Sequence, residues 1–290
     1  MKKLTINSKY LNPLTDFGFH KLFGTESCKE LLIDFLNEII KDKGLITDIQ
    51  YFPPEQWGYS RNDRRAVFDI FCMNEKEEYF IVEMQRAKQT YFRDRSIFYS
   101  SLPIRKQAPR GVWDYCLKTV YVVAVLDFVL FNEFEDDNEY VIESVSLTRK
   151  RTKTKYSDKL NFVFVELPKF RKTEEELETN VDKWLYILKN LSHLEDRPVS
   201  VQGKIFEDLF KLAEITQLTK SDMKEYKKSV LKYHDVRDAM SCAREESHEE
   251  GRKEEKMAII QKCLQMNMPI EVIVNLTGFS EEQIIRFNNK

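Results

Sequence analysis

The sequence is poor in the residues that interrupt regular structure. Among 290 residues there are only 8 glycines and 8 prolines, a combined share well below the roughly 12% of average proteins. Hydrophobic residues make up 42% of the chain and aromatic residues 12%. This composition excludes collagen-like, low-complexity and disordered chains, and it predicts a well-packed core rich in helix.

Paired cysteines and long apolar runs are also absent. The five cysteines are far apart, their number is odd and no CxxC motif occurs, which argues against a disulfide framework or a zinc cluster. No apolar segment follows the two lysines near the N-terminus, and the most apolar stretch, residues 120–131, is interrupted by Asp127 and too short to span a bilayer. We therefore expect a cytoplasmic protein without a membrane segment.

The chain has no large excess of charge of either sign. Lys and Arg number 46 against 48 Asp and Glu, which gives a net charge of −2 and excludes a globally basic nucleic-acid binder. Basic residues gather in residues 86–110, with seven basic residues against one acidic residue, and again in residues 149–155. A nucleic-acid-binding surface would have to be such a local patch, although either stretch is equally consistent with a solvated surface.

Hydrophobic periodicity predicts an α/β region in the first part of the chain. Apolar residues at three-and-four spacing predict two helices between residues 13 and 40, with a break at Gly24 and with Asp16, Thr25 or Ser27 as candidate N-caps. The polar residues 74–77 separate two strand-like segments, which indicates a β-hairpin. The predicted strands cover residues 46–52, 64–73, 77–85, 118–131, 140–148 and 161–168, and a basic helix is predicted within residues 86–110.

Strand signals stop near residue 170, and helical patterns follow. We expect four parts: residues 1–170 as an α/β core, 171–243 as a helical extension packed on it, 244–256 as a charged hinge or solvated helix, and 257–290 as a small helical tail resembling a helix-turn-helix. In the tail we expect three short helices, the last preceded by a capping box of Ser280 and Gln283. The acidic start of that last helix disfavours DNA reading, so packing or homo-oligomerisation through this region is an equally good interpretation.

One predicted strand carries an acid among apolar residues. Strand alternation places Asp69 on one face, and Phe68 and Ile70 together on the other. In the following strand the same alternation places Glu83 and Gln85 on one face. Pairing about the turn would let the carboxylates of Asp69 and Glu83 converge on one hard cation.

Two carboxylates with phosphate oxygens and waters form a coordination set that suits Mg²⁺, and Mn²⁺ is a possible substitute. The alternative is that Asp69 and Glu83 are acids near strand ends that face solvent or pair with Arg64 or Arg65, since half-solvated strands routinely carry charge.

The order of these elements resembles the PD-(D/E)xK nuclease core, and more closely the PD-(D/E)xK nuclease family transposases, also known as recombination-promoting nucleases. The matching fragments are NPLTDFGFHKLFG, LLIDFLNEII, FDIFCMNEKEEYFIVEMQ, RSIFYSSLPIRKQ, VYVVAVLDF, VELPKF, DKWLYILKNL, EEGRKEE and TGFSEEQI. The resemblance implies a restriction-endonuclease-like α/β fold, a mixed central sheet flanked by helices, followed by an all-helical C-terminal region.

The same resemblance implies a Mg²⁺-dependent DNA endonuclease that promotes recombination or transposition-like events. Asp69 and Glu83 would be its metal ligands, and Gln85 stands where the wider superfamily has a lysine. A neutral amide orients and hydrogen-bonds but carries no charge. The alternative function is a catalytically inactive DNA-binding or protein-interaction member of the same fold.

Further candidates lie before and after this pair. Asp16 is either a third acid near the metal or a helix N-cap. Where members of the family generally read DFGFK, this chain has His20, and Lys21 is the adjacent cation.

The basic helix supplies three more candidates, Arg95, Tyr99 and Gln107. Arg95 and Tyr99 are four residues apart and share a helix face. They are candidates for holding a phosphate, the alternative being a solvated helix face.

Overall fold

The computed structural model describes residues 8–41, 44–53, 55–56, 66–108, 111–134 and 139–288. The chain forms two compact units, Met1–His234 and Asp235–Lys290. Among the described helices, none is both long and apolar enough to cross a membrane.

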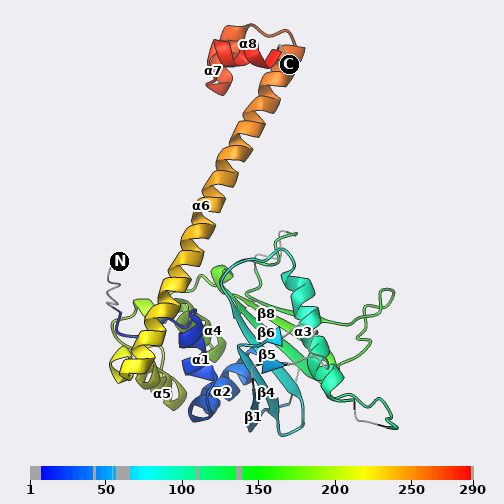
Figure 1. Cartoon of the computed structure of the whole chain (residues 1–290), viewed down its shortest axis with the longest axis vertical. Coiled ribbons are helices and arrows are strands. Elements are labelled where there is room, and N and C mark those ends of the chain that lie inside the picture. Colours follow the sequence, from blue (N-terminus) through cyan, green and yellow to red (C-terminus); the bar gives the residue numbers. More distant parts are fainter. Residues whose placement is uncertain are drawn as a thin grey trace. The chain divides into compact units, whose positions relative to one another are not determined.

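A six-stranded mixed sheet lies at the centre of the first unit (Figure 1). The strands follow the order β1-β4-β5-β6-β8-β7; β5, β6 and β8 run parallel, and the remaining pairings are antiparallel. Their bounds are β1 (Ile49–Phe52), β4 (Ile70–Asn74), β5 (Tyr79–Gln85), β6 (Val120–Leu126), β7 (Ile142–Ser146) and β8 (Leu160–Glu166). The predicted β4–β5 hairpin is confirmed, and every residue of β6 is buried, as its nearly unbroken apolar sequence requires.

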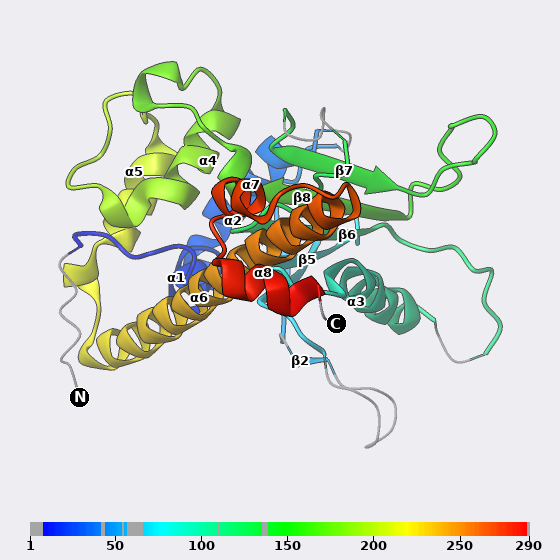
Figure 2. The same ribbon diagram turned by 90° about the horizontal axis from the view of Figure 1, so that it is seen from above.

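Helices cover both faces of the sheet (Figures 1 and 2). On one face lie α1 (Asp16–Phe23), α2 (Lys29–Ile39), α4 (Asn180–Asn190) and α5 (Lys204–Ala213), and on the other lies α3 (Phe92–Lys106). Alternation along β5 divides the core accordingly, because Phe80 and Val82 belong to the same hydrophobic cluster as Trp184 of α4, whereas Ile81 belongs to the cluster that contains Phe92 of α3. Short 3₁₀ helices connect these elements: η1 (Glu26–Cys28), η3 (Leu167–Lys169), η4 (Glu174–Glu176), η5 (Leu191–His193) and η6 (Ile215–Gln217).

The start of α1 differs from the prediction. Thr15, not Asp16, is the N-cap, and its hydroxyl oxygen accepts a hydrogen bond from the backbone N–H of Gly18 at 3.0 Å. Asp16 is the first helical residue, so its carboxylate is available to other partners. Gly24 ends α1, as predicted, and Thr25 is the N-cap of η1, which leads into α2.

The strand predicted through Asp69 is broken at that residue. The short strand β3 (Ala66–Val67) pairs with β2 (Glu55–Gln56), whereas β4 begins only at Ile70 and pairs with β1 and β5. Because the chain changes partner strands here, Asp69 lies in a bend. Phe68 packs on the α3 side and Ile70 on the opposite side, so the prediction that they share a face is wrong.

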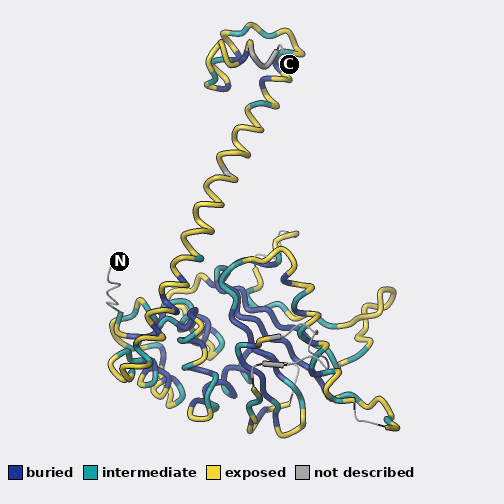
Figure 3. Tube along the Cα trace, in the orientation of Figure 1, coloured by how far each residue is buried: buried dark blue, intermediate teal, exposed yellow. Residues whose placement is uncertain are grey.

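The helical part of the chain is less segmented than predicted. A single 46-residue helix, α6 (Lys220–Gln265), runs through residues 244–256, which were expected to form a charged hinge or a solvated helix, and it agrees with the second of these alternatives. These residues are exposed wherever the structure describes their burial (Figure 3). The first of the three short helices predicted for the tail is therefore the end of α6. The compact units divide between residues 234 and 235, and the predicted four-part division stays a prediction.

The second unit has a small core of its own. Ile260 of α6 packs with Ile273 of α7 (Ile270–Thr277) and Ile284 of α8 (Glu281–Asn288). The predicted capping box before α8 is confirmed, because Ser280 N–H donates to the Gln283 side chain at 2.9 Å and Gln283 N–H donates to the Ser280 hydroxyl at 3.3 Å. Homo-oligomerisation through this region stays a prediction.

Candidate active site

The β4–β5 hairpin brings Asp69 and Glu83 together. Ile70 pairs with Val82 across the two strands, so the residue before Ile70 lies beside the residue after Val82. The backbone N–H of Asp69 donates to Glu83 Oε1 at 3.3 Å, and the N–H of Met84 donates to Asp69 Oδ2 at 2.7 Å. Each carboxylate therefore contacts the backbone of the neighbouring strand segment.

Two further side chains contact Glu83 through its other oxygen. Gln85 Nε2 donates to Glu83 Oε2 at 3.3 Å, and Arg95 Nη2 lies 3.4 Å from the same oxygen. The Arg95 guanidinium also stacks on the ring of Tyr99, 4.7 Å from its centroid. Three of the residues predicted from the sequence, Gln85, Arg95 and Tyr99, thus lie around the buried carboxylate of Glu83.

Burial and mutual repulsion raise the free energy of the state in which Asp69 and Glu83 are both ionised. Burial, together with the nearby charge of Asp69, raises the pKa of Glu83 to about 8, although Arg95 acts in the opposite direction. Burial also raises the pKa of Asp69, against the hydrogen bond from Met84 N–H. Glu83 is only 4% exposed, so water does little to screen the two carboxylates from each other.

A hard divalent cation fits this pair. Mg²⁺ is typically held by one or two carboxylates and completes its shell with waters and phosphate oxygens. Across the described residues, no group of three or more His, Cys, Asp or Glu side chains is placed to hold a metal ion. The donor set that suits the expected ion is therefore Asp69 and Glu83, and the positive charge would offset the repulsion that raises their pKa values.

Asp16 lines the same cavity as Asp69 and pairs with two cations. Its Oδ1 accepts a hydrogen bond from Arg86 Nη2 and its Oδ2 from Lys232 Nζ, the latter at 2.8 Å. Burial favours a raised pKa, but Lys232 and Arg86 outweigh it and lower the pKa of Asp16. The ionised Asp16 in turn contributes to the raised pKa of Asp69, so Asp16 acts electrostatically on that carboxylate.

Close packing positions the turn before Asp16. A Cβ on Gly18 would lie 2.0 Å from the carbonyl oxygen of Asn12, so the approach of α1 to the preceding loop requires glycine. The Asn12 N–H donates to the hydroxyl of Tyr226 in α6 at 2.9 Å. The loop and α6 thus hold the N-terminal end of α1 beside the acids.

Two of the predicted residues are engaged elsewhere. Lys21 Nζ lies 3.7 Å from Asp222 Oδ2. The side chain of Gln107 accepts from Lys118 N–H at 2.6 Å and donates to its carbonyl at 3.3 Å, which joins the end of α3 to the approach to β6. The alternative partners Arg64 and Arg65 lie outside the described residues.

Sequence reasoning missed the contribution of Arg86 and of α6. Arg86 directly follows Gln85, and its Nη1 is buried without a hydrogen-bond partner among the described residues. A cavity of about 480 Å³ is lined by Asp69, Asp16 and His20 and, from α6, by Lys228, Ser229 and Lys232. The four-residue spacing of the two lysines is visible in the sequence, but their approach to α1 is a tertiary contact.

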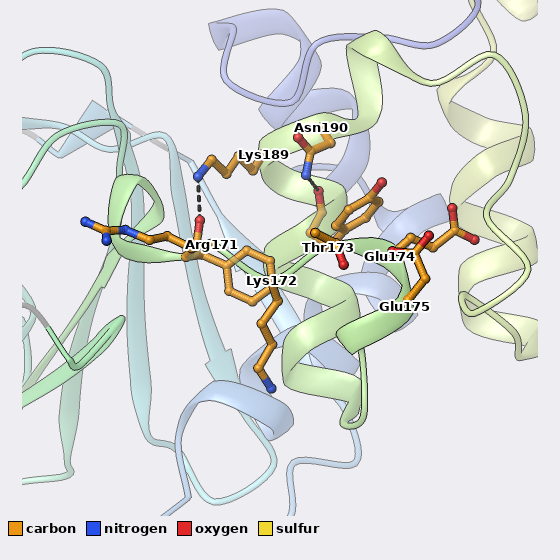
Figure 4. Close-up of a pocket in the computed structure, with 9 residues that line it drawn as sticks. Arg171, Lys172, Thr173, Glu174, Glu175, Lys189 and Asn190 are labelled. Atoms are coloured by element: carbon orange, nitrogen blue, oxygen red, sulfur yellow. Dashed lines mark hydrogen bonds between the residues drawn. The ribbon is translucent and has the colours of Figure 1, made fainter.

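A second cavity, of about 460 Å³, lies outside this group of residues (Figure 4). It is lined by residues 170–175 and by Tyr186, Lys189 and Asn190 of α4. Lys189 Nζ donates to the carbonyl of Phe170 and Asn190 Nδ2 to that of Tyr186 (Figure 4). These side chains join α4 to the chain that leaves η3, which is a structural role.

Comparison with known proteins agrees with the architecture of the first unit. The family model of the PD-(D/E)XK nuclease family transposases matches residues 13–243. No curated protein and no solved structure matches the chain. The matched range begins before α1 and extends into α6, so it includes the whole mixed sheet with Asp69, Glu83 and Gln85. The fold class predicted from the sequence is confirmed, and the chain belongs to the PD-(D/E)XK nuclease family transposases.

Proposed function

We propose that the protein is a Mg²⁺-dependent DNA endonuclease that hydrolyses phosphodiester bonds and promotes recombination or transposition-like events. The observation that carries the proposal is the convergence of Asp69 and Glu83 from neighbouring strand segments, with a raised pKa for both. Perturbed carboxylates beside a cavity are typical of functional sites. The family membership of the chain supports DNA as the substrate.

In this proposal the side chains have distinct roles. Asp69 and Glu83, both ionised, hold the cation through oxygen atoms, which Mn²⁺ also accepts. Bound Mg²⁺ supplies positive charge at the phosphate and lowers the pKa of coordinated water. Arg95 holds the Glu83 carboxylate in place through its 3.4 Å contact. Gln85 orients its neighbours by hydrogen bonding and takes up no proton, because an amide is neutral.

The test is nicking of supercoiled plasmid by the purified chain with Mg²⁺, with Mn²⁺ and with EDTA. We expect cutting with either ion, none with EDTA, and calorimetric binding of Mg²⁺ that is lost in Asp69→Asn. Glu30→Gln is the matched control, because Glu30 is an exposed acid on α2. DNA binding without cutting would favour the catalytically inactive alternative, and absence of both would refute the proposal.

A further inference from the structure

The cavity beside Asp69 is formed by α1 and the first turns of α6. One hydrogen bond joins the two helices, because Phe17 N–H donates to Ser229 Oγ at 3.0 Å, and a second joins the loop before α1 to α6, because Asn12 N–H donates to the Tyr226 hydroxyl at 2.9 Å. Tyr226 and Ser229 are both buried. The wall that α6 contributes is therefore firmly positioned within the first unit.

The α6 wall contributes two lysines and one acid to the cavity that Asp69 also lines. Glu225, Lys228 and Lys232 recur at three- and four-residue spacing, which puts them on one helix face. Lys228 makes no ion pair within the described part of the chain, and Lys232 is paired only with Asp16 there. Phe17 and the half-exposed Val67 add apolar surface to the same cavity.

We propose that this cavity binds a backbone phosphate of the DNA strand, adjacent to the phosphate that is cut, with Lys228 and Lys232 as its donors. The inference rests on the proposed function, since it assigns the substrate contacts of the same site. Phe17 and Val67 lie against the deoxyribose that follows this phosphate. Contacts of this kind set the register of the strand without reading its sequence.

The Lys232–Asp16 pair supports this assignment. The two side chains are 65% and 45% exposed, so their pairing contributes little to stability and is readily exchanged. A phosphate in the cavity offers Lys232 a charge-assisted hydrogen bond in place of the carboxylate. Asp16 keeps its second cation, Arg86, which is largely buried, so the exchange leaves no unpaired acid. In the free protein, the carboxylate of Asp16 takes the place of the phosphate.

Binding measurements separate this proposal from the catalytic one. We would titrate a short fluorescent DNA duplex with the full chain over a series of salt concentrations, in EDTA and again with Ca²⁺, which takes oxygen ligands as Mg²⁺ does. We expect Lys228→Gln and Lys232→Gln each to weaken binding about tenfold at low salt. Each should also reduce the slope of log K against log salt by about 0.9, the loss of one phosphate contact.

Lys227→Gln is the matched control, because Lys227 is exposed on a different face of the same helix. Lys232→Arg should restore binding and the salt slope, and circular dichroism should show every variant folded. If the wild type binds DNA and the double variant Lys228→Gln/Lys232→Gln binds it as tightly as Lys227→Gln does, the cavity assignment is overturned and the proposed function is unaffected. Equal losses in Lys227→Gln would also overturn it, since charge anywhere on α6 would then suffice. A wild type that binds DNA in neither condition would overturn this assignment and the proposed function together.

Discussion

Glu83 and Glu166 are buried acids on parallel strands of the same sheet, but their partners differ. Glu83 lies near the end of β5 and Glu166 at the end of β8, with β6 between them. Glu166 is fully buried; its Oε1 accepts from the N–H groups of Leu130 and Phe131, and its Oε2 lies 2.5 Å from Lys169 Nζ. Within the described residues, the hydrogen-bond partners of the Glu83 carboxylate lie at 3.3–3.4 Å, and a second carboxylate is nearby.

This difference shows that burial of an acid does not by itself mark a functional site. The charge of Glu166 is matched by a cation and two backbone donors, so its burial serves to hold residues 130 and 131 against η3. The charge of Glu83 is poorly matched, because repulsion from Asp69 adds to desolvation. An acid whose ionised form is destabilised by burial and by a neighbouring carboxylate is a candidate functional residue.

The largest expected effect is on catalysis. Asp69→Asn and Glu83→Gln each remove a negative ligand at nearly constant volume, so plasmid cutting with Mg²⁺ should fall by roughly 10³-fold, about 4 kcal/mol of transition-state stabilisation. Circular dichroism and the urea midpoint should show that the fold is kept. Cutting at the wild-type rate by either variant would mean that the metal site lies elsewhere.

The next effect concerns stability. Glu166→Gln leaves the buried ammonium of Lys169 without this carboxylate, which should reduce the free energy of unfolding by about 3 kcal/mol or more. Urea denaturation measures the loss, and the double variant Glu166→Gln/Lys169→Met should recover part of it because the charge is removed as well. If Glu83→Gln destabilises the chain as much as Glu166→Gln does, the distinction between the two acids fails.

Gln85→Ala should have a milder effect than loss of either acid. Gln85 contacts Glu83 without carrying charge, so its removal should slow single-turnover cutting by about 10²-fold or less. Calorimetry should show Mg²⁺ binding retained, and Gln85→Lys, which restores the residue of the wider superfamily, should keep activity. A loss as deep as that of Asp69→Asn would make Gln85 a metal ligand instead.

The smallest expected effect is a dependence of stability on pH in EDTA. Because the pKa of Glu83 is raised to about 8 in the folded chain, the folded state binds its proton more tightly than the unfolded state does. Its contribution to stability is complete below the ordinary Glu pKa and is lost as the pH rises through 8. Between pH 6 and 9 the Tm of the wild type should therefore fall by a few degrees relative to Glu83→Gln.

Addition of Mg²⁺ should reverse that trend, since a cation favours the ionised carboxylates. Glu166→Gln, in which Glu83 is intact, should keep the wild-type pH trend. A wild type and a Glu83→Gln variant with parallel Tm profiles would show that Glu83 is ionised throughout this range.

Local patterns in the sequence determined the sheet and the pairing of the two acids. A polar turn at residues 74–77 between two apolar segments specifies a hairpin, and a hairpin has one register that buries the correct faces. Asp69 and Glu83 are only 14 residues apart, so this one turn suffices to bring them together. The unbroken apolar run of β6 likewise predicted its place inside the sheet.

Tertiary structure alone decided which other side chains join the pair. Lys232 reaches Asp16 across 216 residues, and Tyr226 reaches Asn12 across 214, distances over which no periodicity carries information. Asp69 lies in a bend because β3 and β4 have different partner strands. Gln107 hydrogen-bonds to the backbone of Lys118 and not to the described residues around Glu83. Such contacts depend on where whole elements pack, and helix and strand periods specify only which face of an element is buried.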